Sequence, residues 1–273
     1  MLPASPPMAV PRVMGLLGTP LLLTSYAGLA ELLEARSAAD PPVVVDFSNT
    51  HIVTMRRHQP EFRRLTGGVN WFVPDGMPLI WCLNRAGAGL RDRVYGPTFM
   101  DHCLRGLSGV TSHYLVGGSE ECGRKLREKY SVLNPRLRFV GGFHGRCGDD
   151  GRLSAEDEER VAREIRDTRP DFVWIGLGAP KQYAWLASNH ALLPRGVVLT
   201  VGQAFDVNAG LRPDAPAWMQ RLGLTWFYRL ASEPARLGPR YLKYNSLFLF
   251  YVLWDGLRGR LFAPPTEEPA RPS

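Results

Sequence analysis

Short apolar runs alternate with amphipathic stretches along most of this chain. The runs are rich in β-branched or aromatic residues, and most of them end in glycine, which is typical of buried strands that lead into a turn. They span residues 43–47, 71–73, 114–117, 137–141, 171–176 and 196–201. Buried strands that alternate with helices predict an α/β fold, namely a Rossmann-like, mostly parallel sheet with flanking helices.

The stretches between these runs carry helix signals. Ser154, followed three residues later by Asp157, forms a capping-box pattern, and the acids around Asp157 suit the positive end of a helix. This helix is expected to end before Pro170. Near the start of the chain, residues 13–23 predict a strand and a turn, and residues 26–35 predict an amphipathic helix. A signal peptide is a weaker interpretation, because no clean cleavage site of small residues follows.

Four segments follow from these patterns. Residues 1–12 are proline-rich and predict a disordered N-terminal segment, and residues 263–273 predict a disordered tail of similar composition. Residues 13–215 predict the Rossmann-like domain. Residues 216–262 change to aromatic and basic helical patterns, which predicts a basic C-terminal helical appendage.

Eight consecutive apolar residues, 247–254, lie inside this appendage. They are far fewer than the roughly 20 residues that a membrane-spanning helix requires. Lys243 precedes them, and Arg258 and Arg260 follow, which is typical of a helix that lies in a membrane interface. A helix docked on the protein core explains the same residues, and the sequence leaves both interpretations open.

Positive charge is concentrated in the same part of the chain. The 273 residues carry a formal net charge of +7, and residues 212–262 account for +5 of it. Such a block predicts an anionic partner, which is nucleic acid, a phosphate-bearing substrate or an anionic membrane. The spacing of the four cysteines matches no zinc pattern, so we expect reduced thiols in a cytosolic protein.

Ligands of open parallel sheets bind beyond the carboxyl ends of the strands. Gly117 and Gly118 follow one predicted strand, residues 176–182 (GLGAPKQ) follow another, and residues 202–206 (GQAFD) follow a third. None is a GxGxxG fingerprint or a phosphate loop, but three glycine turns in one sheet favour a nucleotide site. Asp75 follows a further strand in a Pro-Asp-Gly sequence, as a turn former or as a general base. Taken alone, that sequence favours the turn.

Seven motifs in order resemble the WecG/TagA/CpsF family of bacterial glycosyltransferases, from about residue 43 to residue 241. They are PDGMPL (74–79), DRVYG (92–96), YLVGG (114–118), IGLGAPKQ (175–182), VGQAFD (201–206), GLTWFYRL (223–230) and EPARLGPRY (233–241). Each motif is weak alone, but the whole set in this order is specific.

The resemblance implies a reaction and a set of partners. Family members transfer a sugar, often N-acetylmannosamine, from a UDP donor to a sugar linked to polyprenyl diphosphate at the inner membrane face. They are inverting and metal-independent, have a basic C-terminal appendage that helps to place them on the membrane, and are often homo-oligomers. For this chain the resemblance implies a UDP-sugar donor, a polyprenyl-diphosphate-linked acceptor and an anionic membrane surface. It also implies no metal, no cofactor, and a cytoplasmic location peripherally associated with the inner face of the plasma membrane.

The resemblance also assigns residues. The family's proposed base falls on Asp75, and its sugar- and phosphate-contacting residues fall on Asn49, Arg93 and Gln182. The strand-end motifs add further candidates for the donor sugar and diphosphate, which are Gly117, Gly118, Gly178, Gly202 and Asp206. The candidates for acceptor or lipid phosphate are Arg229, Arg236 and Arg240.

The chemistry of sugar transfer supports these roles. A sugar hydroxyl is a poor nucleophile near neutral pH, so a carboxylate within hydrogen-bond reach must take its proton. The departing UDP gathers negative charge on its diphosphate, which a metal or fixed cations stabilise. The sequence has no Asp-x-Asp pair, so Arg93 and the appendage arginines are the candidates, with ordinary solvated surface charge as the alternative for each.

Two positions make the donor sugar uncertain. Many family members have threonine where this chain has Phe47, and Ser48 and Thr50 are the neighbouring hydroxyls that would compensate. His51, beside Asn49, is either a donor-site ligand or a packed histidine. Both positions leave the identity of the donor open.

Two further departures lie in or beside the appendage. Family members often have arginine where this chain has Asp214, and glutamate where it has Thr225. Both leave open which contacts the appendage makes.

We therefore predict an inverting, metal-independent glycosyltransferase for an N-acetylmannosamine-type or related hexose, acting in cell-envelope or exopolysaccharide biosynthesis. A Rossmann-type, nucleotide-dependent oxidoreductase is the first alternative, but it predicts a dinucleotide fingerprint that the chain lacks. A non-catalytic nucleic-acid-binding module is the second, and it predicts salt-dependent binding to the basic block. We expect no nucleic-acid partner. The oligomeric state stays open.

Overall fold

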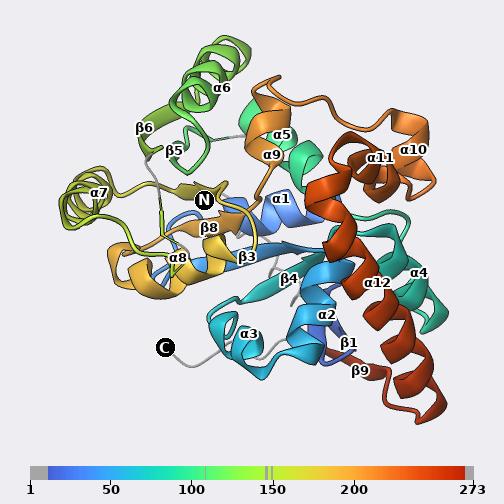
Figure 1. Ribbon diagram of the computed structural model, residues 1–273. Helices are drawn as coiled ribbons and strands as arrows, with labels where there is room; N and C mark the ends of the chain where they lie inside the picture. Colours follow the sequence, from blue (N-terminus) through green and yellow to red (C-terminus); the bar gives the residue numbers. More distant parts are fainter. Residues whose placement is uncertain (1–11, 108, 145–146, 149, 268–273) are drawn as a thin grey trace, which may run out of the picture.

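A nine-stranded sheet forms the centre of the computed structural model, which describes residues 12–107, 109–144, 147–148 and 150–267 (Figure 1). Within these residues the strand order is β6-β5-β7-β8-β3-β4-β2-β1-β9. The strands are β1 (Arg12–Leu16), β2 (Thr19–Leu22), β3 (Val43–Ser48), β4 (Trp71–Pro74), β5 (Ser112–Val116), β6 (Arg138–Phe143), β7 (Phe172–Ile175), β8 (Val197–Thr200) and β9 (Phe262–Glu267). All six strands predicted from the apolar runs are present, as β3 to β8.

The strands from β6 to β2 run parallel, and the edge formed by β1 and β9 is antiparallel. Parallel strands are buried on both faces, which explains why the sequence shows continuous apolar runs there. Along β3, Val43 and Val45 belong to one layer of the core, and Val44 belongs to the other. The prediction of a Rossmann-like, mostly parallel sheet is therefore confirmed.

The antiparallel edge differs from the prediction. The opening segment forms a hairpin of two strands, β1 and β2, where the sequence predicts one strand. Arg12 and residues 263–267 were predicted to be disordered. Instead, Arg12 belongs to β1 and residues 263–267 belong to β9, and these two strands pair with each other. Proline-rich composition predicts disorder, but an edge strand tolerates proline because one row of its N–H groups needs no partner. Residues 1–11 and 268–273 lie outside the described residues.

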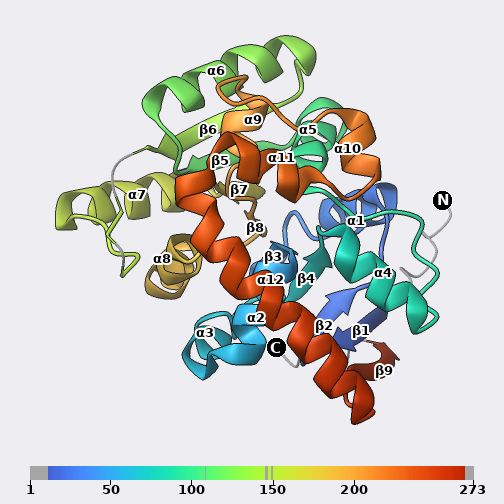
Figure 2. The same cartoon turned by 45° about the vertical axis from the view of Figure 1, so that its right-hand side comes forward.

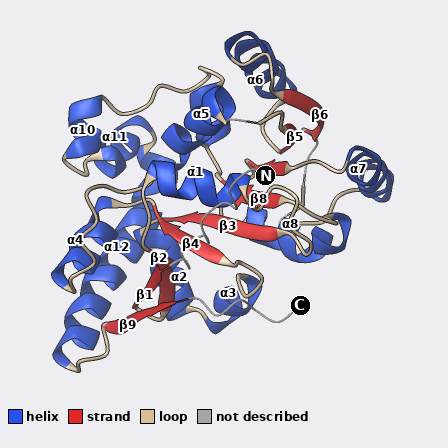
Figure 3. Cartoon of the chain, turned by 180° about the vertical axis from the view of Figure 1, so that it is seen from behind, coloured by secondary structure: helices blue, strands red, loops and turns tan. Residues whose placement is uncertain are grey.

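Helices cover both faces of the sheet (Figure 3). They are α1 (Tyr26–Glu34), α2 (Thr50–His58), α3 (Pro60–Leu65), α4 (Met77–Arg85), α5 (Gly96–Gly106), α6 (Glu120–Leu133), α7 (Ala155–Thr168), α8 (Lys181–Asn189), α9 (Ala204–Asn208), α10 (Ala217–Arg221), α11 (Thr225–Ser232) and α12 (Pro234–Leu257). Helices α1, α5, α6 and α9 contribute to one core layer, and α2, α4, α7, α8 and α12 contribute to the other. The predicted cap is confirmed, because Ser154 Oγ accepts the N–H of Asp157 and α7 ends before Pro170.

The long helix α12 lies across α2 (Figure 2). Arg57 of α2 donates to buried Asp255 of α12 at 2.9 and 3.1 Å, and Phe248 enters the core. The docked interpretation of residues 247–254 therefore holds for this side of the helix. The other side keeps large apolar residues exposed, namely Leu249, Phe250, Leu253, Trp254 and Leu257. Within the described ranges, no helix is both long and apolar enough to cross a membrane.

Candidate active site

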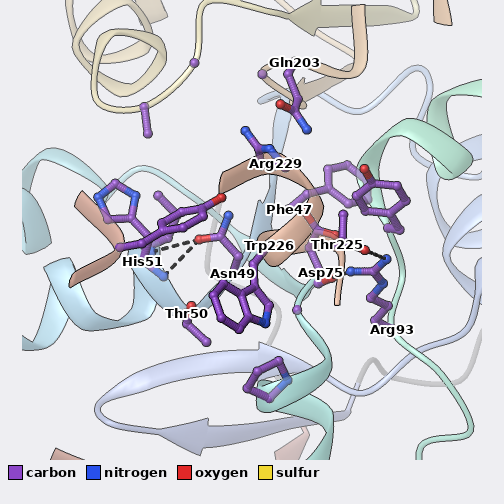
Figure 4. Close-up of a pocket in the computed structure, with 18 of the residues that line it drawn as sticks. Phe47, Asn49, Thr50, His51, Asp75, Arg93, Gln203, Thr225, Trp226 and Arg229 are labelled. Atoms are coloured by element: carbon purple, nitrogen blue, oxygen red, sulfur yellow. Dashed lines mark hydrogen bonds between the residues drawn. The ribbon is translucent and has the colours of Figure 1, made fainter. Parts of the chain in front are cut away.

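The carboxyl ends of β3, β4, β7 and β8 open into a cavity of about 660 Å³, and residues of α11 and α12 form its opposite wall (Figure 4). This edge of a parallel sheet is where ligands are expected. The lining includes most of the residues predicted from the sequence, which are Asn49, Asp75, Arg93, Gly178, Gln182, Gly202, Asp206, Arg229, Arg236 and Arg240. Folding therefore brings the separate motifs to one place.

Asp75 follows β4 directly and lies in the wall of the cavity. Its backbone N–H donates to the carbonyl of Ser48 at 2.7 Å, and its Oδ1 is buried without a hydrogen-bond partner among the described residues. Burial raises the pKa of Asp75 to about 7, although the nearby Arg93 and Arg229 guanidinium groups oppose the shift. Asp75 is thus a turn residue through its backbone, and its side chain can accept a proton near neutral pH.

Arg93 lies beside Asp75 and is only 7% exposed. Its guanidinium donates to the carbonyl of Asp75 at 3.3 Å and to the hydroxyl of Thr225 at 2.9 Å. The same group lies 4.3 Å from the centre of the Tyr95 ring. These three partners are neutral, so the charge of Arg93 acts on the nearby Asp75 carboxyl group, whose pKa it lowers, and on any anionic ligand in the cavity.

Two amide side chains complete this wall. Asn49 caps α2, because its Oδ1 accepts the N–H groups of His51 at 3.0 Å and Ile52 at 3.3 Å. Its NH₂ group is therefore the part that can donate to a ligand. Gln182 lies in the first turn of α8, is 5% exposed, and has a buried Oε1 with no partner in the described part of the chain. An unpaired buried acceptor is costly, so this atom favours a ligand that donates a hydrogen bond.

A second carboxyl group lies beneath the cavity. Asp46 on β3 is fully buried and accepts hydrogen bonds from Ser48 at 2.5 Å, Tyr183 at 2.7 Å and Thr200 at 2.5 Å. Burial raises the pKa of Asp46 despite these three donors. Tyr183 and Thr200 line the cavity, so Asp46 holds its floor in place.

The helical wall of the cavity is cationic. Arg229 has a buried Nε without a partner among the residues the structure describes. Burial lowers the pKa of Arg240, and the nearby Arg236 and Arg229 guanidinium groups lower it further. Crowded cations of this kind favour an anionic ligand, and guanidinium groups match the geometry of phosphate oxygens.

Arg236 also lines the cavity, but it has an acidic partner. Its Nε donates to Glu233 at 2.5 Å, and Glu233 also forms an ion pair with Arg212. A phosphate group would have to compete with Glu233 for Arg236. Arg229 and Arg240 are therefore better placed to hold phosphate.

Gly117 and Gly118, predicted beside the donor, do not belong to the lining of the cavity. They have positive φ angles of +98° and +73°, and a Cβ atom on Gly117 would lie 2.9 Å from Leu177 Cδ2. The turn after β5 therefore needs glycine to pack against the turn after β7.

Other lining residues are not singled out by the sequence. Gln203 follows β8, and its buried Oε1 has no partner within the described ranges; its place in VGQAFD is the signal that points to it. Trp81 on α4 and Trp226 on α11 line the cavity and are largely exposed. A hydrophobic pattern cannot distinguish such tryptophans from core residues, because it does not show which helices face each other.

Phe47 occupies the position where many family members have threonine. It is buried against Phe99, with ring centroids 5.3 Å apart, and it lines the cavity. Of the two neighbouring hydroxyls, Thr50 lines the cavity, whereas the Ser48 hydroxyl donates to Asp46 beneath it. Thr50 is thus the hydroxyl that faces the cavity at this end, where it donates to Asn245 Oδ1 at 3.4 Å and can still accept a hydrogen bond from a ligand.

His51 is both packed and part of the lining. Its ring lies edge-on to Tyr244, with centroids 4.5 Å apart. Burial lowers the pKa of His51 to about 3, and Arg240 and Arg229 act in the same direction. The imidazole is therefore neutral at physiological pH.

The two departures near the appendage meet at Arg93. Asp214 accepts a hydrogen bond from the Tyr95 hydroxyl at 2.8 Å, and the Tyr95 ring supports Arg93. Thr225, at the start of α11, binds Arg93 directly. Helix α11 is thus joined to the residues around Asp75.

Comparisons with known proteins identify the family of this chain. The chain matches the glycosyl transferase WecG/TagA/CpsF family over residues 14–261. Over 213 residues it is 25% identical to the N-acetylglucosaminyldiphosphoundecaprenol N-acetyl-beta-D-mannosaminyltransferase of Staphylococcus aureus strain MRSA252, which covers 77% of this chain and 76% of that protein. The proteins of the same name from strains MW2 and NCTC 8325 / PS 47 give the same identity and coverage. Because the family match spans most of the chain, this protein is a glycosyltransferase that belongs to the WecG/TagA/CpsF family.

Proposed function

We propose that the protein transfers a sugar from a UDP-sugar to a sugar carried on polyprenyl diphosphate, with inversion and without a metal ion. One observation carries the proposal: Asp75, whose buried Oδ1 has no partner among the described residues, faces the same cavity as a cluster of arginines. The names of the relatives describe N-acetylmannosamine transfer to N-acetylglucosaminyl-diphosphoundecaprenol, which supports these substrate classes. The product belongs to cell-envelope or exopolysaccharide biosynthesis.

Asp75 acts as the general base. Its carboxylate takes the proton of the acceptor hydroxyl while that oxygen attacks the anomeric carbon of the donor. The bond from this carbon to UDP breaks on the opposite face, so a single displacement inverts the configuration. The pKa of Asp75, raised to about 7 by burial, suits a base that works near neutral pH.

Guanidinium groups stabilise the leaving diphosphate. In the described part of the chain, the Arg93 guanidinium donates to neutral groups and the buried Nε of Arg229 has no partner, so both side chains can bind phosphate oxygens. Arg240 adds a third positive charge to the cavity. Within the described residues, His, Cys, Asp and Glu side chains form no group of three or more that could hold a metal ion. The proposal of metal independence rests on the three arginines.

The sheet-end wall binds the donor sugar. The NH₂ group of Asn49 and the Oε1 atom of Gln182 supply a donor and an acceptor for sugar hydroxyls or an acetamido group. Phe47 replaces a hydroxyl by an aromatic ring at the edge of this site. We therefore propose an N-acetylmannosamine-type or related hexose, chosen at Phe47 and Thr50.

A membrane surface is the third proposed partner. Phe250, Leu253 and Trp254 of α12 are exposed, and the Arg258 guanidinium lies 3.8 Å from the centre of the Trp254 ring. Exposed apolar residues beside basic ones favour the interface of an anionic membrane. This surface supports peripheral association with the inner face of the plasma membrane, where a lipid-linked acceptor is accessible.

A substrate panel tests the proposal. The full-length protein is incubated with UDP-N-acetylmannosamine and other UDP-hexoses, N-acetylglucosaminyl-diphospho-lipid and either EDTA or Mg²⁺. We expect transfer from at least one donor, opposite anomeric configuration in the product, and the same rate with EDTA. Loss of activity in EDTA that Mg²⁺ restores would overturn metal independence.

The same preparation distinguishes the alternatives. Thermal stabilisation by NAD but not by UDP, without sugar transfer, would favour an oxidoreductase. Steeply salt-dependent binding of DNA or RNA, again without transfer, would favour a nucleic-acid-binding module.

A further inference from the structure

We propose that the apolar end of the active-site cavity binds the hydrocarbon chain of the acceptor, next to its diphosphate. This end, the α4–α12 groove, is lined by Met77, Trp81 and Cys82 of α4 and by Phe248, Leu249 and Val252 of α12. The two helices lie beside each other in Figures 1 and 2. The identity of the occupant rests on the proposed function, but the test of the groove does not require sugar transfer.

The cavity has two chemically different ends. Near the carboxyl ends of β7 and β8 it is lined by guanidinium groups, including those of Arg229 and Arg240. Between α4 and α12 the lining is aromatic, aliphatic or sulfur-containing, and Asn245 lies between the two parts along α12. A nucleotide sugar is polar along its whole length and does not need an apolar end. A lipid-linked sugar diphosphate has both a charged and an apolar part.

The order of these groups along α12 matches their order in such an acceptor. Arg236 and Arg240 lie in the first two turns of the helix, and Phe248 and Val252 lie further along it. At 1.5 Å per residue, Arg240 and Val252 are about 18 Å apart along the axis. Asp75 lies two residues before the start of α4, which forms the other side of the groove. The acceptor sugar, its diphosphate and the first part of its chain can therefore contact Asp75, the arginines and the groove together.

Leu249 connects the groove with the outer surface. It lines the cavity, and it is also 61% exposed. Leu242 and Leu253, seven residues before it and four after it, lie on the same side of α12 and are exposed as well. A chain longer than the groove can therefore leave the cavity along apolar surface.

Membrane attachment alone does not explain why apolar side chains line the inside of the cavity. Trp81, Cys82 and Val252 line the cavity, and Trp81 belongs to α4, which follows the candidate base. Trp81 is nevertheless 55% exposed, so it presents apolar area that a bound hydrocarbon chain can cover. The charge at one end and the apolar lining at the other favour one occupant, a hydrocarbon chain attached to a diphosphate.

Binding of farnesyl diphosphate, compared with inorganic diphosphate, tests the groove. Both are titrated into the full-length protein by calorimetry, without detergent or lipid and below the concentration at which farnesyl diphosphate forms micelles. Burial of the chain against Trp81 and Leu249 should make farnesyl diphosphate bind at least about tenfold more tightly, equivalent to about 1.4 kcal/mol.

Three variants assign this preference to the groove. Trp81→Ala and Leu249→Ser should each reduce it to about threefold or less and leave the affinity for inorganic diphosphate unchanged. Leu257→Ser is the matched control, because Leu257 is an exposed leucine of the same helix and does not line the cavity. It should keep the full preference. The altered residues are exposed, and the melting temperature of each variant verifies its fold.

The outcomes separate this inference from the proposed function. Two results would contradict the proposal that the groove binds a hydrocarbon chain, even if sugar transfer is observed. One is equal affinity of the unaltered protein for the two ligands, and the other is the same loss of preference in all three variants. A preference that Trp81→Ala and Leu249→Ser abolish and Leu257→Ser retains supports the groove even if the donor panel shows no transfer.

Discussion

The two walls of the cavity differ in how their side chains are held. In the sheet-end wall, Arg93 and Gln182 are almost fully buried, and Asp75 has a pKa raised to about 7 by burial. In the helical wall, Arg229 and Arg240 are partly exposed, and they share that wall with apolar side chains such as Leu249. Burial thus dominates one wall, and positive charge and apolar area dominate the other.

This difference separates two tasks. A buried carboxylate with an altered pKa suits a chemical step, because burial changes its proton affinity. Partly exposed cations bind the diphosphate before and while it leaves, and apolar groups bind the ligand without taking part in the reaction. Substitutions in the sheet-end wall should therefore lower kcat most, and substitutions in the helical wall should act mainly on substrate or membrane binding.

The largest effect is expected for Asp75→Asn. The amide keeps the shape of the side chain but cannot take a proton, so kcat for sugar transfer should fall by about 10²- to 10⁴-fold. Thermal stabilisation by UDP should remain as in the unaltered protein, which verifies that the donor site is intact. A kcat near that of the unaltered protein would show that Asp75 is not the base.

The pH profile should reflect the same group. Because burial raises the pKa of Asp75 to about 7, its basic form is lost as the pH falls below that value. We expect kcat/KM to decline about tenfold per pH unit below 7, or about a hundredfold at pH 5. His51 does not contribute to this decline, because its pKa is lowered to about 3. A flat profile between pH 5 and pH 8 would contradict the role of Asp75.

Arg229→Gln tests the helical wall. Removal of one cation from the leaving diphosphate should lower kcat/KM for the UDP-sugar about ten- to a hundredfold. Arg221→Gln is the matched control, because Arg221 is an exposed arginine of α10 outside the lining of the cavity, and it should have little effect. If both variants lose activity equally, general surface charge explains the result better than contact with phosphate.

Thr225→Val tests the contact that joins the two walls. The substitution keeps the size of the side chain but removes the hydroxyl that accepts a hydrogen bond from Arg93 at 2.9 Å. We expect about a tenfold loss of kcat. The pKa seen in the pH profile should also rise, because a displaced Arg93 no longer lowers the pKa of Asp75. Thr225→Ser should restore both values, which a merely structural role of the methyl group would not explain.

Most of the fold follows from local patterns in the sequence. Strands β3, β4, β5, β7 and β8 are buried on both faces, and together with the partly exposed β6 they appear as apolar runs; the α7 cap is a contact between residues three positions apart. The β1–β9 pair cannot be predicted from local patterns, because its two strands are at opposite ends of the chain. Only pairing across that distance turns the proline-rich segment into an edge strand.

The residues of the site also divide into those that the sequence predicts and those that only the structure reveals. The resemblance to the family identifies Asp75, Asn49 and Arg93, and the parallel sheet brings the strand ends that precede Asn49 and Asp75 to one edge. The contacts of the helical wall depend on how α11 and α12 pack, which a linear pattern does not contain. The pairing of Arg212 with Glu233 and the bond from Arg93 to Thr225 are therefore found only in the folded chain.

The smallest effect is expected at the outer face of α12. Leu253 is 68% exposed and does not line the cavity, so Leu253→Ser should leave transfer to a short-chain, water-soluble acceptor unchanged. Partitioning onto vesicles that contain anionic lipid should weaken about three- to tenfold, because less apolar area enters the interface. Val132→Ser is the control. Val132 is an exposed residue of α6, and α6 packs on the opposite face of the sheet from α12. Equal vesicle binding by the two variants would show that this face of α12 does not meet the membrane, and the helical wall would then act on the acceptor through the cavity alone.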